Sequence, residues 1–236
     1  MSLSFRAESK QKKVLMKNQT SKALQIIHIL RSATKNMTPP AGLSIVKQFG
    51  RDPYLVLISC LLSLRAKDSA SLPASIKLFE YAKTPQEMVK LPIATIEKII
   101  FTTGFYRNKA KTLLSVSHEL LTRFNGIVPH TREELMSLRG VGPKTAALVM
   151  ADGFEIPAIC VDIHVHRISN RLGLIHTKTP QETEIALQKI LPKEHWREWN
   201  SLMVMYGQNI CVPVSPFCSK CPLFDLCQRV GVRRSR

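Results

Sequence analysis

Apolar residues along the chain recur at helical spacing, and no segment alternates apolar and polar residues in the way that predicts a strand. The stripe formed by Leu24, Ile27 and Leu30 predicts a helix over about 21–33. Other apolar stripes predict helices over 52–64, 73–82, 85–91, 93–101 and 108–124. We therefore expect an all-α protein made of many short helices with short connections.

The segment 131–153 has the pattern of two helices joined by a tight turn. Thr131 and Glu134 form a capping-box pattern for a short helix that ends near Leu138. Two glycines follow within four residues and favour a turn, and Pro143 suits the first position of the second helix. The turn itself comprises Arg139, Gly140, Val141 and Gly142.

The charge balance narrows the class of partner. The chain has 34 Lys and Arg residues against 17 Asp and Glu residues, a formal net charge of +17. A surplus of this size favours nucleic acid, then an anionic membrane, with a merely basic protein as the alternative. The longest apolar stretch, 54–64, is too short for a membrane span, which needs ~20 residues. No apolar signal-peptide core is present, so secretion is not expected. We expect a flexible basic arm over 1–18.

The glycine turn can hold a phosphate. Glycines let the backbone approach an anion closely, and the N–H groups in the first turn of a helix have no helical partners. A turn of this kind binds the DNA backbone without reading sequence. An ordinary interhelical turn is the alternative, and the strongly basic charge favours DNA.

Lys144 and Asp162 are the candidate chemical groups. Lys144 lies in the first turn of its helix, where the positive end of the helix dipole disfavours an ammonium and should lower the pKa. A neutral amine can attack C1′ of a nucleotide, although most lysines at such positions only contact phosphate. Asp162 is placed to cap a helix over 163–172, which would by itself explain its presence.

Six cysteines fall into two groups. Cys60 and Cys160 stand alone in apolar surroundings and are typical of buried small side chains. The other four have six, two and five residues between them, a spacing that suits one metal centre. These four are Cys211, Cys218, Cys221 and Cys227. Ligand type alone allows either Zn²⁺ or a [4Fe–4S] cluster, and zinc is the commoner of the two.

The run 138–171, with Val161-Asp162-Ile163-His164 inside it, resembles the helix–hairpin–helix DNA glycosylase superfamily, and within it the endonuclease III group. The similarity extends over about 21–227 and includes the segments 61–63 and 103–110. It implies two helical domains with a DNA-binding cleft between them. The first is a six-helix barrel over 46–156 that contains the helix–hairpin–helix at 131–153. The second is an iron–sulfur cluster domain formed by 19–45 and 157–230, followed by a basic tail over 231–236.

The resemblance also implies an activity. Lys144 becomes the nucleophile of a base-excision-repair DNA glycosylase with apurinic/apyrimidinic lyase activity, and Asp162 its catalytic carboxylate. The implied substrates are oxidised pyrimidines in double-stranded DNA, flipped out of the helix. The four clustered cysteines would bind a [4Fe–4S] cluster. The implied DNA-binding residues are Arg65, Phe105, Arg139, Gly140, Val141, Gly142, Thr145 and His164. A monomer in the cytoplasm at the nucleoid, or in a eukaryotic nucleus or mitochondrion, is expected.

Two departures from the family pattern keep alternatives open. Many relatives carry Gln where this chain has Arg65, so the preferred opposite base is in doubt. Relatives often have Lys or Arg between the first two clustered cysteines, whereas 212–217 is uncharged here. The alternatives are a glycosylase for mismatches or other lesions, and a non-catalytic DNA-binding protein. A mismatch adenine glycosylase usually lacks Lys at position 144, and a pure binder needs neither that lysine nor Asp162.

Overall fold

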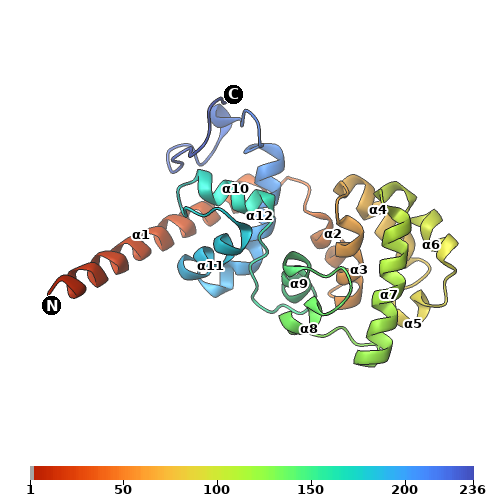
Figure 1. Ribbon diagram of the computed structural model, residues 1–236. Helices are drawn as coiled ribbons and strands as arrows, with labels where there is room; N and C mark the ends of the chain where they lie inside the picture. The colour runs from red at the N-terminus through yellow and green to blue at the C-terminus, as the bar shows by residue number, and fades with distance from the viewer. Residues whose placement is uncertain (1–2) are drawn as a thin grey trace. The chain divides into compact units, whose positions relative to one another are not determined.

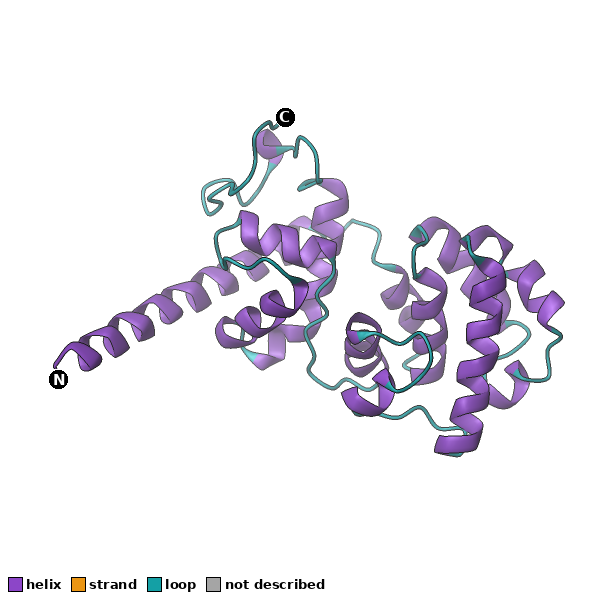
Figure 2. Cartoon of the chain, in the orientation of Figure 1, coloured by secondary structure: helices purple, strands orange, loops and turns teal. Residues whose placement is uncertain are grey.

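The computed structural model describes residues 3–236, and Met1 and Ser2 of the expected arm lie outside that range. Within it, all regular secondary structure is helical, which confirms the all-α prediction (Figure 1, Figure 2). The chain divides into two compact units. We call 39–158 the hairpin unit, and 1–38 with 159–236 the cysteine unit. Among the described helices, none has both the length and the apolar character to span a membrane.

The hairpin unit is a series of short helices. They are α2 (Ala41–Phe49), α3 (Pro53–Ser63), α4 (Asp68–Phe79), α5 (Pro85–Met88), α6 (Ile93–Ile99), η1 (Phe101–Thr103), α7 (Tyr106–Phe124), α8 (Arg132–Met136), α9 (Pro143–Leu148) and the π-helical turn η2 (Val149–Gly153). The structure thus confirms the helix expected over 143–153, and its last turn is wider than an α-helix.

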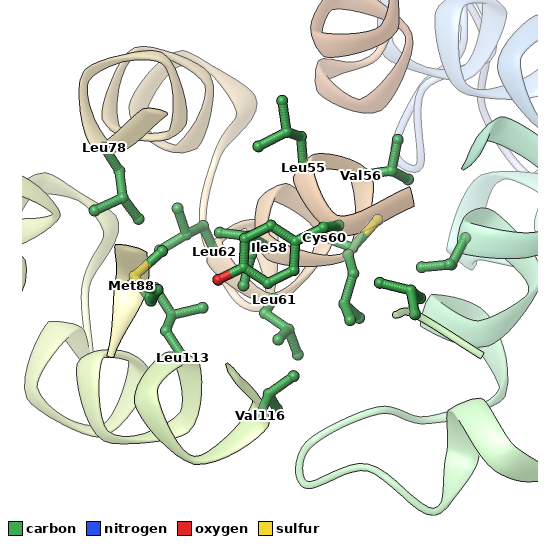
Figure 3. Close-up of a cluster of buried hydrophobic side chains, with 14 of the residues drawn as sticks. Leu55, Val56, Ile58, Cys60, Leu61, Leu62, Leu78, Met88, Leu113 and Val116 are labelled. Carbon is green, nitrogen blue, oxygen red and sulfur yellow. The ribbon is translucent and has the colours of Figure 1, made fainter. Parts of the chain in front are cut away.

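Helix α3 is the centre of the hairpin unit. All nine residues from 54 to 62 are buried, which explains why this stretch is apolar on every face. The Asp52 carboxylate caps the helix by accepting from the N–H groups of Tyr54 and Leu55, at 2.8 and 3.1 Å. Leu61 and Leu62 pack with Leu113 of α7 in the core (Figure 3). Each fully buried leucine contributes roughly 1.5–3 kcal/mol to folding.

Helix α4 begins earlier than expected, since the sequence predicted a helix that starts at Pro73. The helix begins at Asp68, and Pro73 is its sixth residue. A proline there removes one backbone hydrogen bond, from its own nitrogen to the carbonyl of Ser69. Both residues are exposed, so water can bond to that carbonyl instead. Exposure therefore makes an interior proline tolerable.

The cysteine unit is built from helices far apart in sequence. They are α1 (Leu3–Ala33), α10 (Ile163–Arg171), α11 (Pro180–Ile190), η3 (Lys193–His195), α12 (Trp196–Asn209) and η4 (Cys218–Lys220). Helix α1 packs against α11 and α12, and α10 packs against α12. The core is centred on Trp199 and Tyr206, both almost wholly buried.

Two segments differ from their expected placement. The segment 1–18, expected as a basic arm, is helical from Leu3 onward and forms the first half of α1. It contains no Gly or Pro that would end the helix. Residues 39–45, expected to belong with the cysteine-rich domain, fall in the hairpin unit. They begin α2, whose Ile45 is fully buried in the core around α3.

Candidate active site and cysteine pocket

The hairpin between α8 and α9 forms as the glycine pattern predicts. Thr131 caps α8 by accepting from the Glu134 N–H. Beyond α8, the N–H of Val141 donates to the Leu138 carbonyl at 3.1 Å, which closes the turn. Gly142 is the N-cap residue of α9 and has no side chain to bond the first-turn N–H groups.

The two glycines of the hairpin differ in whether the fold itself needs a glycine at that position. Gly140 has φ of +77°, and an added Cβ would lie 3.1 Å from Cγ2 of Thr112 on α7. Gly142 has φ of −99°, and an added Cβ would meet nothing within 4 Å. The fold therefore requires a glycine at 140 and does not require one at 142.

Lys144 is the second residue of α9, and its side chain is exposed. Its ammonium and the carboxylate of buried Asp152 both lie within electrostatic range of the Cys60 thiol. Burial, reinforced by the Asp152 carboxylate and opposed by Lys144, raises the pKa of Cys60 to about 12. Cys60 is therefore a neutral thiol at physiological pH and does not compete with an amine as nucleophile.

The other hairpin residues divide by exposure. Arg139 is exposed, whereas Val141 and Thr145 are 6 % and 3 % exposed. The expected contact of Val141 and Thr145 with DNA is therefore restricted to their main chain, because their side chains are packed inside the hairpin unit. Arg139 was also expected to contact DNA, and its side chain is exposed to solvent.

Asp162 caps α10 in the cysteine unit, as the sequence predicts. Its Oδ1 accepts from the N–H groups of His164 and Val165, at 2.9 and 2.8 Å. Oδ1 accepts both bonds, which hold the carboxylate in place. Oδ2 takes no part in the cap. A carboxylate held in this way is rigid, which suits a catalytic group as well as a cap.

The two histidines of α10 have separate environments. Nη2 of Arg167 lies 3.2 Å from Nδ1 of half-buried His164. Gly207 makes room for this ring, since a Cβ there would lie 2.5 Å from Nδ1. His166 instead bonds to the Thr183 hydroxyl at 2.7 Å, inside the cysteine unit. His166 is therefore explained by packing.

Arg65 and Phe105 share an unusual backbone conformation. Arg65 has φ of 53° and Phe105 has φ of 47°, in the left-handed region that residues other than glycine rarely adopt. Both side chains are exposed, and Phe105 is 63 % exposed. A large apolar side chain held outward on a strained backbone is typical of a functional position.

The four clustered cysteines line one pocket in the cysteine unit. It is formed by the end of α10, the end of α12 and the segment 210–232. Among the described residues, no three His, Cys, Asp or Glu side chains converge closely enough to hold a single metal ion.

Polar groups point at the sulfur atoms. The Tyr206 hydroxyl lies 2.7 Å from Sγ of Cys221, Nη1 of Arg171 lies 3.6 Å from Sγ of Cys211, and the N–H of Arg229 donates to Sγ of Cys227 at 3.3 Å. Burial raises the pKa of Cys211, and Arg171 opposes that rise. Burial also raises the pKa of Tyr206, which keeps its hydroxyl protonated as a donor.

The uncharged segment 212–217 is tied down from two sides. Arg171 donates to the carbonyls of Val212 and Pro213, at 2.8 and 2.6 Å. Arg236 folds back so that its guanidinium lies 4.0 Å from the ring centre of Phe217 and donates to the Ser215 carbonyl at 3.0 Å. The tail therefore brings a positive charge to a segment that has none of its own.

Comparison with known proteins identifies the family. Residues 58–193 match the model of the HhH-GPD superfamily of base excision DNA repair proteins. Endonuclease III of Thermotoga maritima is 47 % identical over 78 % of this chain and 89 % of its own length. The chain belongs to the endonuclease III group of this superfamily.

Other members of the group extend the comparison. Endonuclease III-like protein 1 of Gallus gallus is 41 % identical over 74 % of this chain, which spans only 63 % of that longer protein. A solved structure of a trapped endonuclease III–DNA covalent intermediate, an estranged-adenine complex, has a TM-score of 0.78 and 34 % identity. That likeness covers 89 % of this chain and 96 % of the solved one.

Within this endonuclease III-like fold, sequence reasoning missed two side chains. Arg171 connects α10 to the cysteine pocket, and Lys109 bridges two loops of the hairpin unit. Both lie in segments that carry the family resemblance, but neither has a local signal, because their partners are distant in sequence. Their contacts after folding distinguish them from the other basic residues of this chain.

Proposed function

We propose that the protein is a base-excision-repair DNA glycosylase with apurinic/apyrimidinic lyase activity, and that Lys144 is its nucleophile. The observation that carries this assignment is an exposed lysine in the first turn of α9, directly after the glycine hairpin, in a chain of the HhH-GPD superfamily. The surface position matters because a nucleophile must reach a nucleotide brought from outside the protein.

The chemistry requires a neutral amine. The Lys144 amine attacks C1′, the C1′–N bond to the base breaks, and the departing base takes up a proton. Nζ then loses a proton, the C1′–O4′ bond breaks and O4′ takes up a proton, which opens the sugar ring and leaves a Schiff base between Nζ and C1′. Removal of a C2′ proton then expels the 3′ phosphate, and water releases the nicked product. We propose Asp162 as the catalytic carboxylate that assists deprotonation of the amine.

The hairpin is assigned to the DNA backbone. Gly142 supports this role because the fold does not need a glycine there, whereas a phosphate approaching the start of α9 would. Arg139 adds an exposed positive charge beside the turn. Contacts of this kind hold any sequence equally, as a repair enzyme requires. His164 is also assigned to DNA binding, as a weaker contact.

We assign base flipping to Phe105 and Arg65. A base inside the duplex cannot reach Lys144, so it must leave the stack and something must occupy its place. Phe105 is apolar and outward-pointing, which suits a wedge between bases. Arg65 can stack on the orphaned partner and donate to it but cannot accept, so it favours partner bases with exposed acceptors. We propose oxidised pyrimidines as the lesions.

We propose that the four clustered cysteines hold a [4Fe–4S] cluster rather than zinc. The proposal rests on their spacing of six, two and five residues in a chain of the endonuclease III group, since ligand type alone suits either centre. The four cysteines line one pocket, and polar groups lie close to three of their sulfur atoms. Such a cluster would serve to hold the segment 210–232 in place.

Borohydride trapping tests the function. The protein is incubated with a duplex containing an abasic site and reduced, and we expect a stable covalent adduct. Lys144→Ala should form none, while Lys98→Ala, which changes an exposed lysine of α6, should react as wild type does. A well-folded wild-type protein that gives no adduct would refute the lyase assignment.

Two further measurements define substrate and cofactor. Duplexes with thymine glycol, dihydrouracil, 8-oxoguanine or a mismatch identify the base removed, and preference for a mismatch would replace our lesion assignment. Iron and sulfide analysis of the purified protein should give four of each per chain, as a [4Fe–4S] cluster contains. Stoichiometric zinc without iron would overturn the cluster assignment.

A further inference from the structure

Lys109 is a buried lysine with two hydrogen bonds to the main chain. It lies in the first turns of α7 and is 8 % exposed. Its Nζ donates to the carbonyl of Leu62 at 2.7 Å and to the carbonyl of Thr103 at 2.9 Å. The amine thus joins the end of α3 to the segment that precedes α7. Lys109 and Leu62 are 47 residues apart in sequence.

Each of the two bonded carbonyls lies two or three residues before one of the residues with positive φ. Leu62 precedes Arg65 by three residues, and Thr103 precedes Phe105 by two. A non-glycine residue with positive φ costs on the order of 1 kcal/mol and persists only where the surroundings hold it. Lys109 holds both segments at the points where each turns outward.

These segments present apolar side chains to solvent. Leu64 is 38 % exposed, and Phe101 and Phe105 are each 63 % exposed. Phe101 contacts the ring of Tyr106, with centroids 5.0 Å apart. Exposed apolar groups gathered on neighbouring loops indicate a surface with a partner. On the proposed function, the faces of stacked bases are the partner that these side chains fit.

We propose that Lys109 is the positioning residue that sets the Arg65 loop and the Phe105 loop in one fixed arrangement for insertion into DNA. The inference rests on the proposed function, since it assigns these loops to base flipping. Lys109 does not touch the substrate in this role, and acts through the backbone that carries Phe105 and Arg65.

The choice of lysine supports the inference. A methionine fills a similar volume without the cost of burying an ammonium, so packing alone favours methionine. Burial lowers the pKa of Lys109 to about 8, a measure of that cost. A neutral amine still has two N–H groups, so it can serve both carbonyls in either protonation state. What the lysine adds over methionine is the link between the two segments.

The test compares a reaction that needs the loops with one that does not. Single-turnover excision of dihydrouracil from a duplex needs the base to be replaced in the stack. Borohydride trapping on a single-stranded abasic oligonucleotide needs Lys144 but no wedge. For Lys109→Met we expect a loss of about 10- to 100-fold in the duplex reaction, typical of misplaced groups, with trapping on the single strand retained. Lys111→Met, which changes an exposed lysine on the same helix, should leave both reactions unchanged.

A double-mutant cycle identifies the route of the effect. If Lys109 acts through Phe105, then Lys109→Met should cause little further loss in a Phe105→Ala background. Lys109→Arg, which keeps several donors, should restore part of the duplex reaction. If Lys109→Met gives no folded protein, Lys109→Gln carries the same comparison, because its shorter amide cannot reach both carbonyls.

Each outcome decides the proposal. Equal losses in the duplex and single-strand reactions, or losses that simply add to those of Phe105→Ala, would overturn the positioning role of Lys109. Failure of the proposed function has a different signature, since wild-type protein would then form no adduct even with the single-stranded abasic oligonucleotide.

Discussion

Helices α9 and α10 each carry a charged residue at their N-terminal end, and only Asp162 caps its helix. Asp162 at the start of α10 bonds two main-chain N–H groups and so contributes to folding. Lys144 at the start of α9 is exposed, and α9 has no side-chain cap. Removing the Lys144 side chain should therefore abolish the chemistry and leave the stability unchanged, whereas removing the Asp162 side chain should reduce both.

The largest expected effect is at α9. Lys144→Ala should lower base excision by roughly 10³-fold or more, as loss of a covalent nucleophile does. Its free energy of unfolding should change by less than about 0.5 kcal/mol, because the side chain is on the surface. Stopped single-turnover assays and urea unfolding measure the two quantities. A clearly destabilised variant would mean that α9 depends on its charged residue after all.

The second effect concerns the far end of α10. Nη1 of Arg171 lies 3.6 Å from Sγ of Cys211, and the same side chain donates to the carbonyls of Val212 and Pro213. Cys211→Ala should therefore lose iron, cost on the order of several kcal/mol and loosen α10 but not α9, because a bound metal centre supplies folding energy. Hydrogen exchange of the two helices measures this. Cys160→Ala is the matched control, a buried cysteine outside the pocket that should keep its iron.

The third effect separates cap from chemistry at Asp162. Asn accepts the same capping bonds as Asp, so Asp162→Asn should keep the stability and lose most of the activity. Asp162→Ala should lose the activity and also about 1 kcal/mol of stability. Full activity in Asp162→Asn would leave the cap as the whole explanation for this residue.

The fourth effect lies in the hairpin itself. Gly140→Ala should cost about 1–2 kcal/mol, because its φ of +77° strains any side chain. Gly142→Ala should change stability by less than about 1 kcal/mol but weaken DNA binding, since the added methyl group projects where a phosphate would approach. Normal binding by Gly142→Ala, measured by fluorescence anisotropy, would remove Gly142 from the interface.

The fifth effect extends the comparison to a third helix start, at α7. Burial lowers the pKa of Lys109 from 10.5 to about 8. Between those pH values the unfolded chain holds a proton that the folded protein has lost, so rising pH stabilises the fold. The stability of wild type relative to Lys109→Met should therefore increase from pH 8 to 10.5, as followed by chemical unfolding. A constant difference would show that the amine is solvated.

The features predicted well from sequence are those with local causes. The Asp162 cap, the glycine hairpin and the apolar helix α3 each depend on residues within a few positions of one another. Helices α2, α11 and α12 were not predicted, although α11 carries a local signal in its Thr179 cap, followed by Pro180 and Glu182. The start of α4 was misplaced because exposure, rather than the presence of Pro73, decides whether a helix tolerates a proline.

The sequence by itself determined the helical class, the glycine hairpin, the basic charge and the cysteine spacing that point to DNA chemistry. These follow from backbone geometry and residue type, which act over one or two turns of chain. Only the tertiary structure decided that Lys109 is buried while Lys144 is exposed, and that Arg171 and Tyr206 face the cysteines. Burial depends on what packs against a residue, and the partners of these side chains come from segments far away in the sequence.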